Sequence, residues 1–553
     1  MHDLFIRGAT VYDGSAKPAR VADVAVTDGR IAAIGRIAHA ARNTLDCGGL
    51  ALMPGIVDIH THYDAQITWD PMLSPSPALG VTTAIMGNCG FGIAPCPAGL
   101  REAMLRNLSV VEGMDLGALL SGTRWEFESF EQYLEQLRRA QPYINVGVLA
   151  GHSTIRTAVM GEDASKREKP TDAELAEMQR LVREAMAAGA AGFASSFSPN
   201  HSGWGGLPMP STIASEVELL ALTGVLGESG RGIFVMATGS RATPAVMESV
   251  AAANGRPAFI VTVLTMYNEA HPGQALAYYA DVAAANARGR EVCIHTSCQP
   301  LSMDFTLRDP YLMLSHDAFD RVRTATPGEL PAIYADPAFR ERLRSNFMHP
   351  EQGILFYGNW ARIEVTSDNR TVAELAREAG KDPLDYFFDR ALAENLDTGF
   401  VGKLYQNSDA GVAPLLKHDA GVVALSDAGA HLIFLCDAGF GLHFLAHWVR
   451  ETGTFTLAEG VRKLTADPAK RYRIPQRGRL EEGNWADLLL FDPKTVGISP
   501  LKRVRDLPGG GSRMMRDPLG VHGVWVNGVR VHDGKDYAAL AGGPGRVLDR
   551  FDA

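Results

Sequence analysis

Three features are scarce in this 553-residue chain: basic runs, long apolar runs and paired cysteines. It carries 53 Lys and Arg against 63 Asp and Glu, a net charge of −10. This acidic balance argues against a nucleic-acid groove or an anionic membrane surface as partner, because both need dense basic patches. No stretch approaches the roughly 18 apolar residues that a membrane span requires. The 46% of apolar residues is typical of a soluble globular protein.

The cysteines do not follow a disulfide pattern. Their spacing shows no pairs, and the N-terminal segment lacks the basic stretch and apolar run of a secretory signal. We therefore expect free thiols in a reduced, cytoplasmic protein. The six are Cys47, Cys89, Cys96, Cys293, Cys298 and Cys436.

Both ends of the chain are typical of short antiparallel strands. Residues 1–53 alternate polar and apolar in short runs that close on Gly and Asp turns. The same texture returns within 473–553, where Asn527-Gly528 indicates a tight hairpin. We predict that these two distant segments form one small β-sandwich domain.

The middle of the chain has an α/β pattern. Short apolar runs alternate with helical stretches such as 174–189, which is typical of βα units around a parallel sheet. Eight strands predict a (β/α)8 TIM-type barrel over 54–472, with its chemistry at the carboxyl ends of the strands. Residues 300–420 are interpreted as a mainly helical insertion between strands seven and eight. The strand candidates are 56–62, 81–88, 144–151, 190–197, 232–238, 258–265, 291–297 and 421–427.

Two histidines end the first predicted strand. In a strand, alternate residues face the same side, so His60 and His62 can both point into the barrel mouth. Two such imidazoles can share one metal ion, and Zn²⁺ suits nitrogen ligands. Asp58 and Asp64 flank the pair, which favours a metal site over two merely hydrogen-bonded histidines.

Two further residues can join this pair. Cys89 ends the second strand and can ligate a metal if a nearby cation displaces its proton; the alternative is a buried, inert thiol. Asp427 follows the eighth strand, which neighbours the first in a closed barrel, so it can ligate the metal and accept a proton from bound water. The alternative role of Asp427 is to cap the N-terminus of the following helix.

Other histidines lie at strand ends on the same face. His152, His201 and His295 follow strands three, four and seven, where each can bind substrate, polarise a carbonyl or complete a coordination shell. Each alone is equally typical of a structural histidine, but three together predict at least one functional residue. His443 and His447 share a helix face without a Glu between them, which favours packing over metal binding.

The order of the motifs resembles a known family. Segments 53–64 (MPGIVDIHTHYD), 88–92 (NCGFG) and 424–431 (ALSDAGAH), between two β modules, resemble the amidohydrolase superfamily. Together with 151–156 (GHSTIR), they resemble its N-acyl-D-amino acid deacylase (D-aminoacylase) branch over nearly the whole chain. The resemblance implies metal-centre roles for His60, His62, Cys89 and Asp427.

The chain departs from that family at three positions. The family's metal-binding histidines after strands five and six correspond to Gly239 and Val263, and its carboxylate-binding lysine corresponds to Thr265. The resemblance thus implies one divalent ion, Zn²⁺, with two ions left as an alternative, and an altered substrate. Arg156 or Arg241 can serve as replacement anchors for an anionic substrate.

The sequence as a whole predicts a metal-dependent hydrolase of an amide-type C–N bond in a small molecule, with metal-activated water and Asp427 as general base. One alternative is a non-catalytic scaffold. Another is a metal-independent hydrolase that uses Cys89 beside His152. A homo-oligomer is left open.

Overall fold

The computed structural model describes residues 1–553 except 39–40, 311–312, 314–316, 347–357, 433–436 and 552–553. The chain forms two compact units. Unit 1 comprises Met1–Thr265, Leu276–Cys298 and Ala413–Ala553, and unit 2 comprises Met266–Ala275 and Gln299–Val412. Within the described part, no helix has the length and apolar character needed to cross a membrane.

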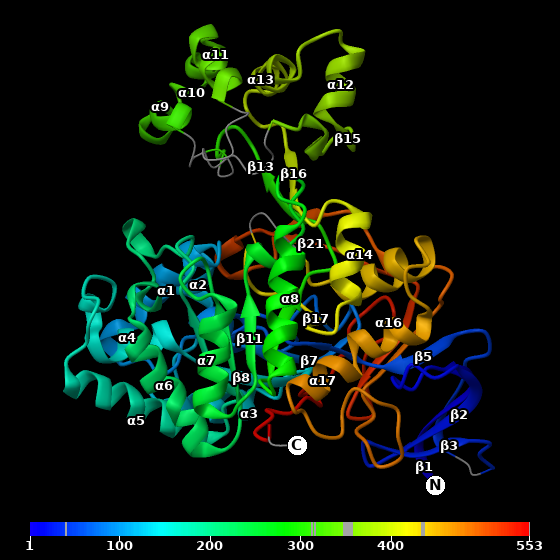
Figure 1. Ribbon diagram of the computed structural model, residues 1–553. Coiled ribbons are helices and arrows are strands. Elements are labelled where there is room, and N and C mark those ends of the chain that lie inside the picture. Colours follow the sequence, from blue (N-terminus) through cyan, green and yellow to red (C-terminus); the bar gives the residue numbers. More distant parts are fainter. Residues whose placement is uncertain (39–40, 311–312, 314–316, 347–357, 433–436, 552–553) are drawn as a thin grey trace. The chain divides into compact units, whose positions relative to one another are not determined.

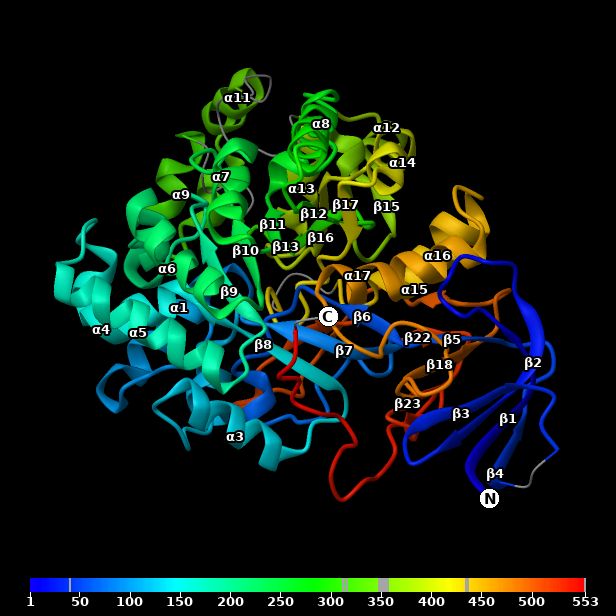
Figure 2. The same ribbon diagram turned by 60° about the horizontal axis from the view of Figure 1, so that its bottom comes forward.

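An eight-stranded parallel sheet forms the centre of unit 1 (Figures 1 and 2). Its strands follow one another in chain order, which is the arrangement of repeated βα units. Every residue of β10 is buried, as expected of parallel strands covered on both faces. The strands are β6 (Ile56–Asp58), β7 (Val81–Met86), β8 (Asn145–Gly151), β9 (Gly192–Ser196), β10 (Ile233–Ala237), β11 (Ala258–Val261), β12 (Val292–Thr296) and β17 (Gly421–Val423).

The first and eighth strands are shorter than predicted. They end at Asp58 and Val423, and the residues beyond them leave regular strand geometry. Positive φ angles of 72° at Leu425 and 44° at Asp427 interrupt the eighth strand. An isolated parallel bridge between Thr61 and Ala428 nevertheless joins the two segments beyond their ends. His60 and Asp427 therefore lie on loops that are paired with each other.

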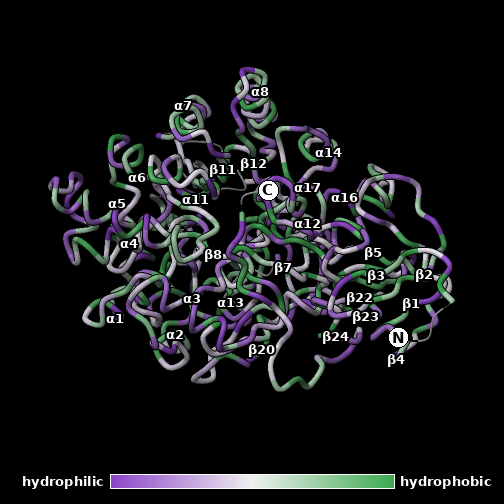
Figure 3. The backbone as a smooth tube through the Cα atoms, turned by 90° about the horizontal axis from the view of Figure 1, so that it is seen from below, coloured by the Kyte–Doolittle hydropathy of each residue, from purple (hydrophilic) through white to green (hydrophobic). Residues whose placement is uncertain are grey.

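The helices of unit 1 surround this sheet. In α5, Thr171 caps the first turn in a capping box with Glu174, and Gly189 ends the helix at a φ of 115°. Hydrophobic and hydrophilic stretches alternate along such helices (Figure 3). The helices are α1 (Arg101–Val111), α2 (Leu116–Gly122), α3 (Phe130–Ala140), α4 (His152–Met160), α5 (Asp172–Ala188), α6 (Glu216–Ser229), α7 (Pro244–Asn254), α15 (Phe440–His443), α16 (Leu457–Leu464) and α17 (Ala466–Arg471). Two more helices, α8 (Gln274–Ala287) and α14 (Asp409–Lys417), begin in unit 2 and end in unit 1.

Both chain ends contribute to a second, mixed sheet. Strand β5 pairs in parallel with β1 and antiparallel with β18, so N- and C-terminal segments share one sheet. Leu4, Val24, Leu488 and Trp525 belong to its common core. The described residues form a single sheet here, where we predicted a sandwich. Its strands are β1 (His2–Val11), β2 (Arg20–Thr27), β3 (Arg30–Gly35), β4 (Ala41–Asp46), β5 (Ala51–Pro54), β18 (Leu488–Phe491), β23 (Val521–Val526) and β24 (Val529–His532).

Unit 1 also contains two separate two-stranded ribbons: β19 (Gly497–Ile498) with β22 (Pro518–Leu519), and β20 (Lys502–Val504) with β21 (Arg513–Met515). The turn predicted at Asn527-Gly528 joins β23 to β24. Its φ angles of 46° and 79° are those of a tight hairpin turn.

Unit 2 combines helices with an antiparallel sheet. Its four strands are ordered β13 (Leu301–Phe305), β16 (Phe400–Tyr405), β14 (Ile363–Val365) and β15 (Arg370–Thr371). The helices of this region were predicted from the sequence, but the sheet was not, because its strands are short and distant in the chain. The helices are α9 (Asp320–Thr324), α10 (Leu330–Ala335), α11 (Pro337–Asn346), α12 (Val372–Glu378) and α13 (Pro383–Ala393).

Candidate metal centre

The backbone brings the predicted ligands to the carboxyl edge of the parallel sheet. His60 and His62 follow β6, Cys89 lies in the turn after β7, and Asp427 follows β17. The amide of His62 donates a hydrogen bond to the Ala428 carbonyl at 2.8 Å, which brings the two loops into register. Residues more than 360 positions apart in the sequence therefore face the same point.

Two of these residues have unusual backbone conformations. Cys89 and Asp427 have φ angles of 56° and 44°, in the left-handed region that residues other than glycine rarely adopt. The glycines beside them are constrained as well. A Cβ at Gly90 would lie 2.8 Å from the Ala194 carbonyl oxygen, and one at Gly429 would lie 2.7 Å from that of His62. Such strain at several neighbouring positions is typical of functional sites.

The side chains converge. Ligand atoms of His60, His62 and Cys89 all lie within 4.8 Å of one another, and all three residues are buried. Asp427 Oδ1 lies 3.2 Å from His60 Nε2 and 3.7 Å from His62 Nε2. Two imidazoles, a thiol and a carboxylate form a donor set that Zn²⁺ accepts, so these residues fit the predicted ion. Within the described ranges, no other His, Cys, Asp and Glu group is this compact.

The electrostatics favour the anionic forms of two ligands. Burial would raise the pKa of both Cys89 and Asp427, but hydrogen bonds to His60 and His62 hold the two pKa values below their ordinary range. Conversely, burial would lower the pKa of His60, but Asp427 and Cys89 raise it to about 9. A metal ion binds the deprotonated forms of Cys and Asp. Its positive charge would replace that of the protonated imidazoles, which bind a metal only when neutral.

Each ligand histidine has a partner on its other ring nitrogen. Nδ1 of His62 lies 3.1 Å from Oε1 of Glu112, which follows α1 and is 2% exposed. Nδ1 of His60 lies 3.1 Å from Nδ1 of His295, whose Nε2 lies 2.8 Å from the hydroxyl of Tyr472. Glu112 and Tyr472 were not among the residues predicted from the sequence. Both lie at helix ends with no motif around them, so only the folded chain reveals them.

His152 and Arg156 belong to a separate buried network. His152 bonds to Ser195 Oγ at 2.8 Å and to Glu218 Oε1 at 2.9 Å, and Arg156 also pairs with Glu218. Arg156 is fully buried and donates further to the Ala164 carbonyl. In the described structure no hydrogen bond joins His152 to Cys89, so the Cys–His pair considered above is not formed.

His201 lies close enough to the candidate centre for Glu112 and Asp427 to act on its charge. His201 bonds to Ser196 Oγ through Nδ1 at 2.7 Å, and burial lowers its pKa to about 4. Arg241 donates to the Thr212 and Ala214 carbonyls and stacks over Phe197, so its guanidinium is already engaged.

His443 and His447 stack on each other at 5.2 Å, and His447 pairs with Glu451. Gly239 and Val263 stand where the family resemblance implies further histidines; Gly239 follows β10, and Val263 lies in a turn after β11.

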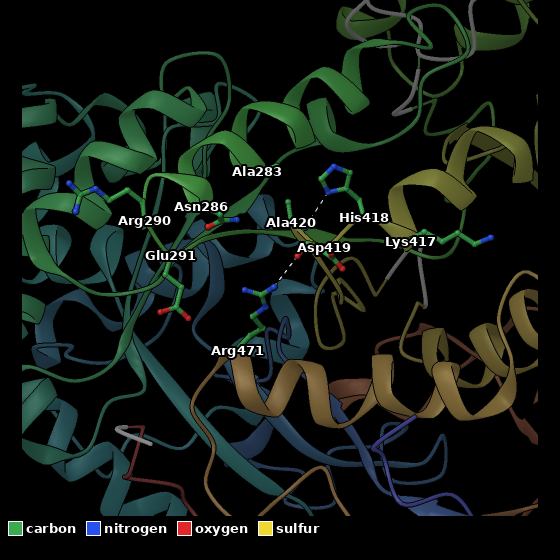
Figure 4. Close-up of a pocket in the computed structure, with 10 residues that line it drawn as sticks. Ala283, Asn286, Arg290, Glu291, Lys417, His418, Asp419, Ala420 and Arg471 are labelled. Carbon is green, nitrogen blue, oxygen red and sulfur yellow. Dashed lines mark hydrogen bonds between the residues drawn. The ribbon is translucent and has the colours of Figure 1, made fainter. Parts of the chain in front are cut away.

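A surface depression of about 760 Å³ lies at the opposite edge of the sheet (Figure 4). Glu291 and Ala420 line it just before β12 and β17 begin, whereas the candidate ligands follow strand ends. In barrels of this kind the amino edge serves stability and the carboxyl edge serves chemistry. The depression is therefore not the candidate active site.

Comparison with known proteins places the chain in a family. A sequence profile of the amidohydrolase family matches residues 43–532. The N-acyl-D-aspartate deacylase and the D-aminoacylase of Alcaligenes xylosoxydans xylosoxydans are each 28% identical to the chain, over all of it and over 96% and 98% of their own lengths.

Solved structures give the same result. An N-acyl-D-glutamate deacylase from Bordetella bronchiseptica, complexed with zinc and a phosphonate inhibitor, is 26% identical with a TM-score of 0.67, covering 99% of this chain and all of its own. A D-aminoacylase described as having a binuclear metal centre is 26% identical with a TM-score of 0.68 over the full length of both chains. The chain belongs to the amidohydrolase family and is D-aminoacylase-like.

Proposed function

We propose that the chain is a metal-dependent hydrolase that cleaves an amide-type C–N bond of a small molecule. The observation that carries the proposal is the convergence of His60, His62, Cys89 and Asp427 at one buried point. The deacylases to which the chain is similar support the reaction class. We further propose that one divalent ion, Zn²⁺, occupies this point. The two histidines that would hold a second ion are expected after strands five and six, but Gly239 and Val263 stand at those positions.

The reaction follows from the roles of these side chains. A bound Zn²⁺ supplies Lewis-acid polarisation of the scissile carbonyl and makes a water molecule acidic near neutral pH. Asp427 accepts the proton of the attacking water and returns it to the leaving nitrogen. Its hydrogen bonds to His60 and His62 lower its pKa, so the carboxylate is ionised at neutral pH and available as the proton acceptor.

The substrate is expected to differ from an ordinary N-acyl-D-amino acid. Thr265 offers no positive charge where the family resemblance implies a lysine, and Arg156 and Arg241 already have partners. Binding a carboxylate in a buried site without a cation costs several kcal/mol, on the order of 3–5. Among the histidines considered, we propose His201 as the substrate-binding residue, since it keeps some exposed surface, unlike His152 and His295, and its Nε2 is not used by Ser196.

We also propose that the parallel sheet closes into a (β/α)8 barrel at residues 54–472, with 300–420 as an insertion. The bridge between Thr61 and Ala428 supports closure. Residues 1–53 and 473–553 would then form one composite domain.

The function is tested with a panel of linear and cyclic amides that includes N-acyl-D-amino acids and uncharged analogues. We expect turnover of at least one uncharged amide, its loss after dialysis against a chelator, and its recovery on addition of Zn²⁺. Chelator-resistant turnover that thiol alkylation abolishes would instead support a cysteine nucleophile. A chain that binds no divalent metal and turns over no amide would support the non-catalytic scaffold.

A further inference from the structure

Three buried side chains form a chain of contacts that leads away from the metal centre. Nδ1 of His60 lies 3.1 Å from Nδ1 of His295, and Nε2 of His295 lies 2.8 Å from the Tyr472 hydroxyl. Their exposed fractions are 0%, 1% and 0%. All three come from different elements: the loop after β6, strand β12 and the end of α17.

The proton positions along these contacts are linked. Two imidazole nitrogens at hydrogen-bond distance require one to carry a proton and the other to accept it. If His60 carries its proton on Nδ1, His295 accepts on Nδ1 and, when neutral, carries its own proton on Nε2, facing the Tyr472 oxygen. In that arrangement Nε2 of His60 has no proton, and its lone pair points toward Cys89 and Asp427. In the reverse arrangement the Tyr472 hydroxyl donates to Nε2 of His295, and a neutral His60 carries its proton on Nε2, which then does not bind a metal.

Packing holds the outer pair in place. The ring of Phe259 lies 4.6 Å from that of Tyr472 and 5.6 Å from that of His295. The amide of Tyr472 donates to the Pro468 carbonyl at 2.9 Å, which fixes its backbone at the helix end. The hydroxyl is thus presented to His295 from a rigid position.

We propose that His295 and Tyr472 are a positioning pair that orients the ring of His60 and keeps its Nε2 directed toward Cys89 and Asp427. The proposal rests on the metal centre proposed above. Such outer partners of metal-bound histidines fix ring orientation and tautomer, and their loss commonly weakens metal binding about 10–100-fold. His62 has a carboxylate partner in Glu112, whereas His60 has this uncharged pair.

The chain offers a matched control for the test. Tyr279 is also fully buried, and its hydroxyl lies 2.6 Å from Oγ1 of Thr296, the residue that follows His295 in β12. Tyr279→Phe and Tyr472→Phe therefore each remove one buried hydroxyl that bonds to the same strand. Only the second removes a hydroxyl from the contacts that reach the metal centre.

The experiment is titration of the metal-free full-length chain with Co²⁺, followed by visible absorption and calorimetry, with thermal unfolding measured for each variant. We expect Tyr472→Phe to weaken Co²⁺ binding about 10–100-fold and to change the cobalt spectrum. Tyr279→Phe should bind as the unaltered chain does. Equal affinities and spectra for both variants would overturn the positioning role while leaving the metal centre intact.

A second pair of variants tests the proposal independently of Tyr472. His295→Asn keeps an amide oxygen able to accept from Nδ1 of His60, whereas His295→Leu removes the acceptor. We expect tighter Co²⁺ binding by His295→Asn than by His295→Leu, and equal affinities would contradict the proposal. If the unaltered chain binds no Co²⁺, the proposed metal centre itself is wrong.

Discussion

Replacing Asp427 by asparagine is expected to lower kcat for amide hydrolysis by about 10³-fold while leaving the chain folded. An amide has nearly the shape of the carboxylate but does not accept a proton at neutral pH. The Asp427 carboxylate lies close to the Nε2 atoms of both ligand histidines, at 3.2 and 3.7 Å. Steady-state kinetics on the amide identified by the substrate panel, at saturating Zn²⁺, give the change in kcat.

Asp437→Asn is a suitable control for this variant. Burial raises the pKa of Asp437 to about 7, so its neutral and ionised forms are about equally populated near neutral pH, and the residue has no role in the proposed reaction. We expect it to retain activity. Turnover by Asp427→Asn within about tenfold of the unaltered chain would remove Asp427 from its role as general base.

Replacing Cys89 by serine is expected to weaken Zn²⁺ or Co²⁺ binding at least 100-fold. Even the outer partners of metal ligands commonly contribute about 10–100-fold to affinity, and loss of a direct thiolate ligand should cost no less. The lowered pKa of Cys89 favours this thiolate form, since its sulfur lies 3.7 Å from Nε2 of His60. Competition with a chromophoric chelator measures the change, and the cobalt form should lose its thiolate-to-metal absorption.

Cys293→Ser provides the matched control. Cys293 is also buried, but burial raises its pKa to about 11, so it remains a protonated thiol. We expect its metal affinity and cobalt spectrum to be unchanged. Retention of the thiolate absorption in Cys89→Ser would show that another residue supplies the sulfur ligand.

The sequence was sufficient to predict the elements that position the site. Hydrophobic runs bounded by Gly and Asp predicted the eight parallel strands, because buried parallel strands are apolar throughout. The ends of those strands then indicated His60, Cys89 and Asp427, which the structure brings together. This inference worked because strand order in the sheet follows chain order.

The partners of these residues were beyond the reach of the sequence. Glu112 and Tyr472 are ordinary residues at helix ends, and their contacts with His62 and His295 span 50 and 177 positions. A strand-end position also does not reveal what a side chain bonds to. Arg156 was a candidate for substrate binding, yet its guanidinium pairs with Glu218 inside the fold.

The most direct test of the metal centre is the metal content of the chain purified without added metal or chelator, compared with the His60→Ala/His62→Ala variant. Removal of two of the four ligands should abolish binding, because the cysteine and aspartate that remain do not complete a tetrahedral site. We predict about one equivalent of Zn²⁺ per chain, lost in the double variant while the fold persists. Two equivalents, or one equivalent that the double variant retains, would contradict a single ion held by His60, His62, Cys89 and Asp427.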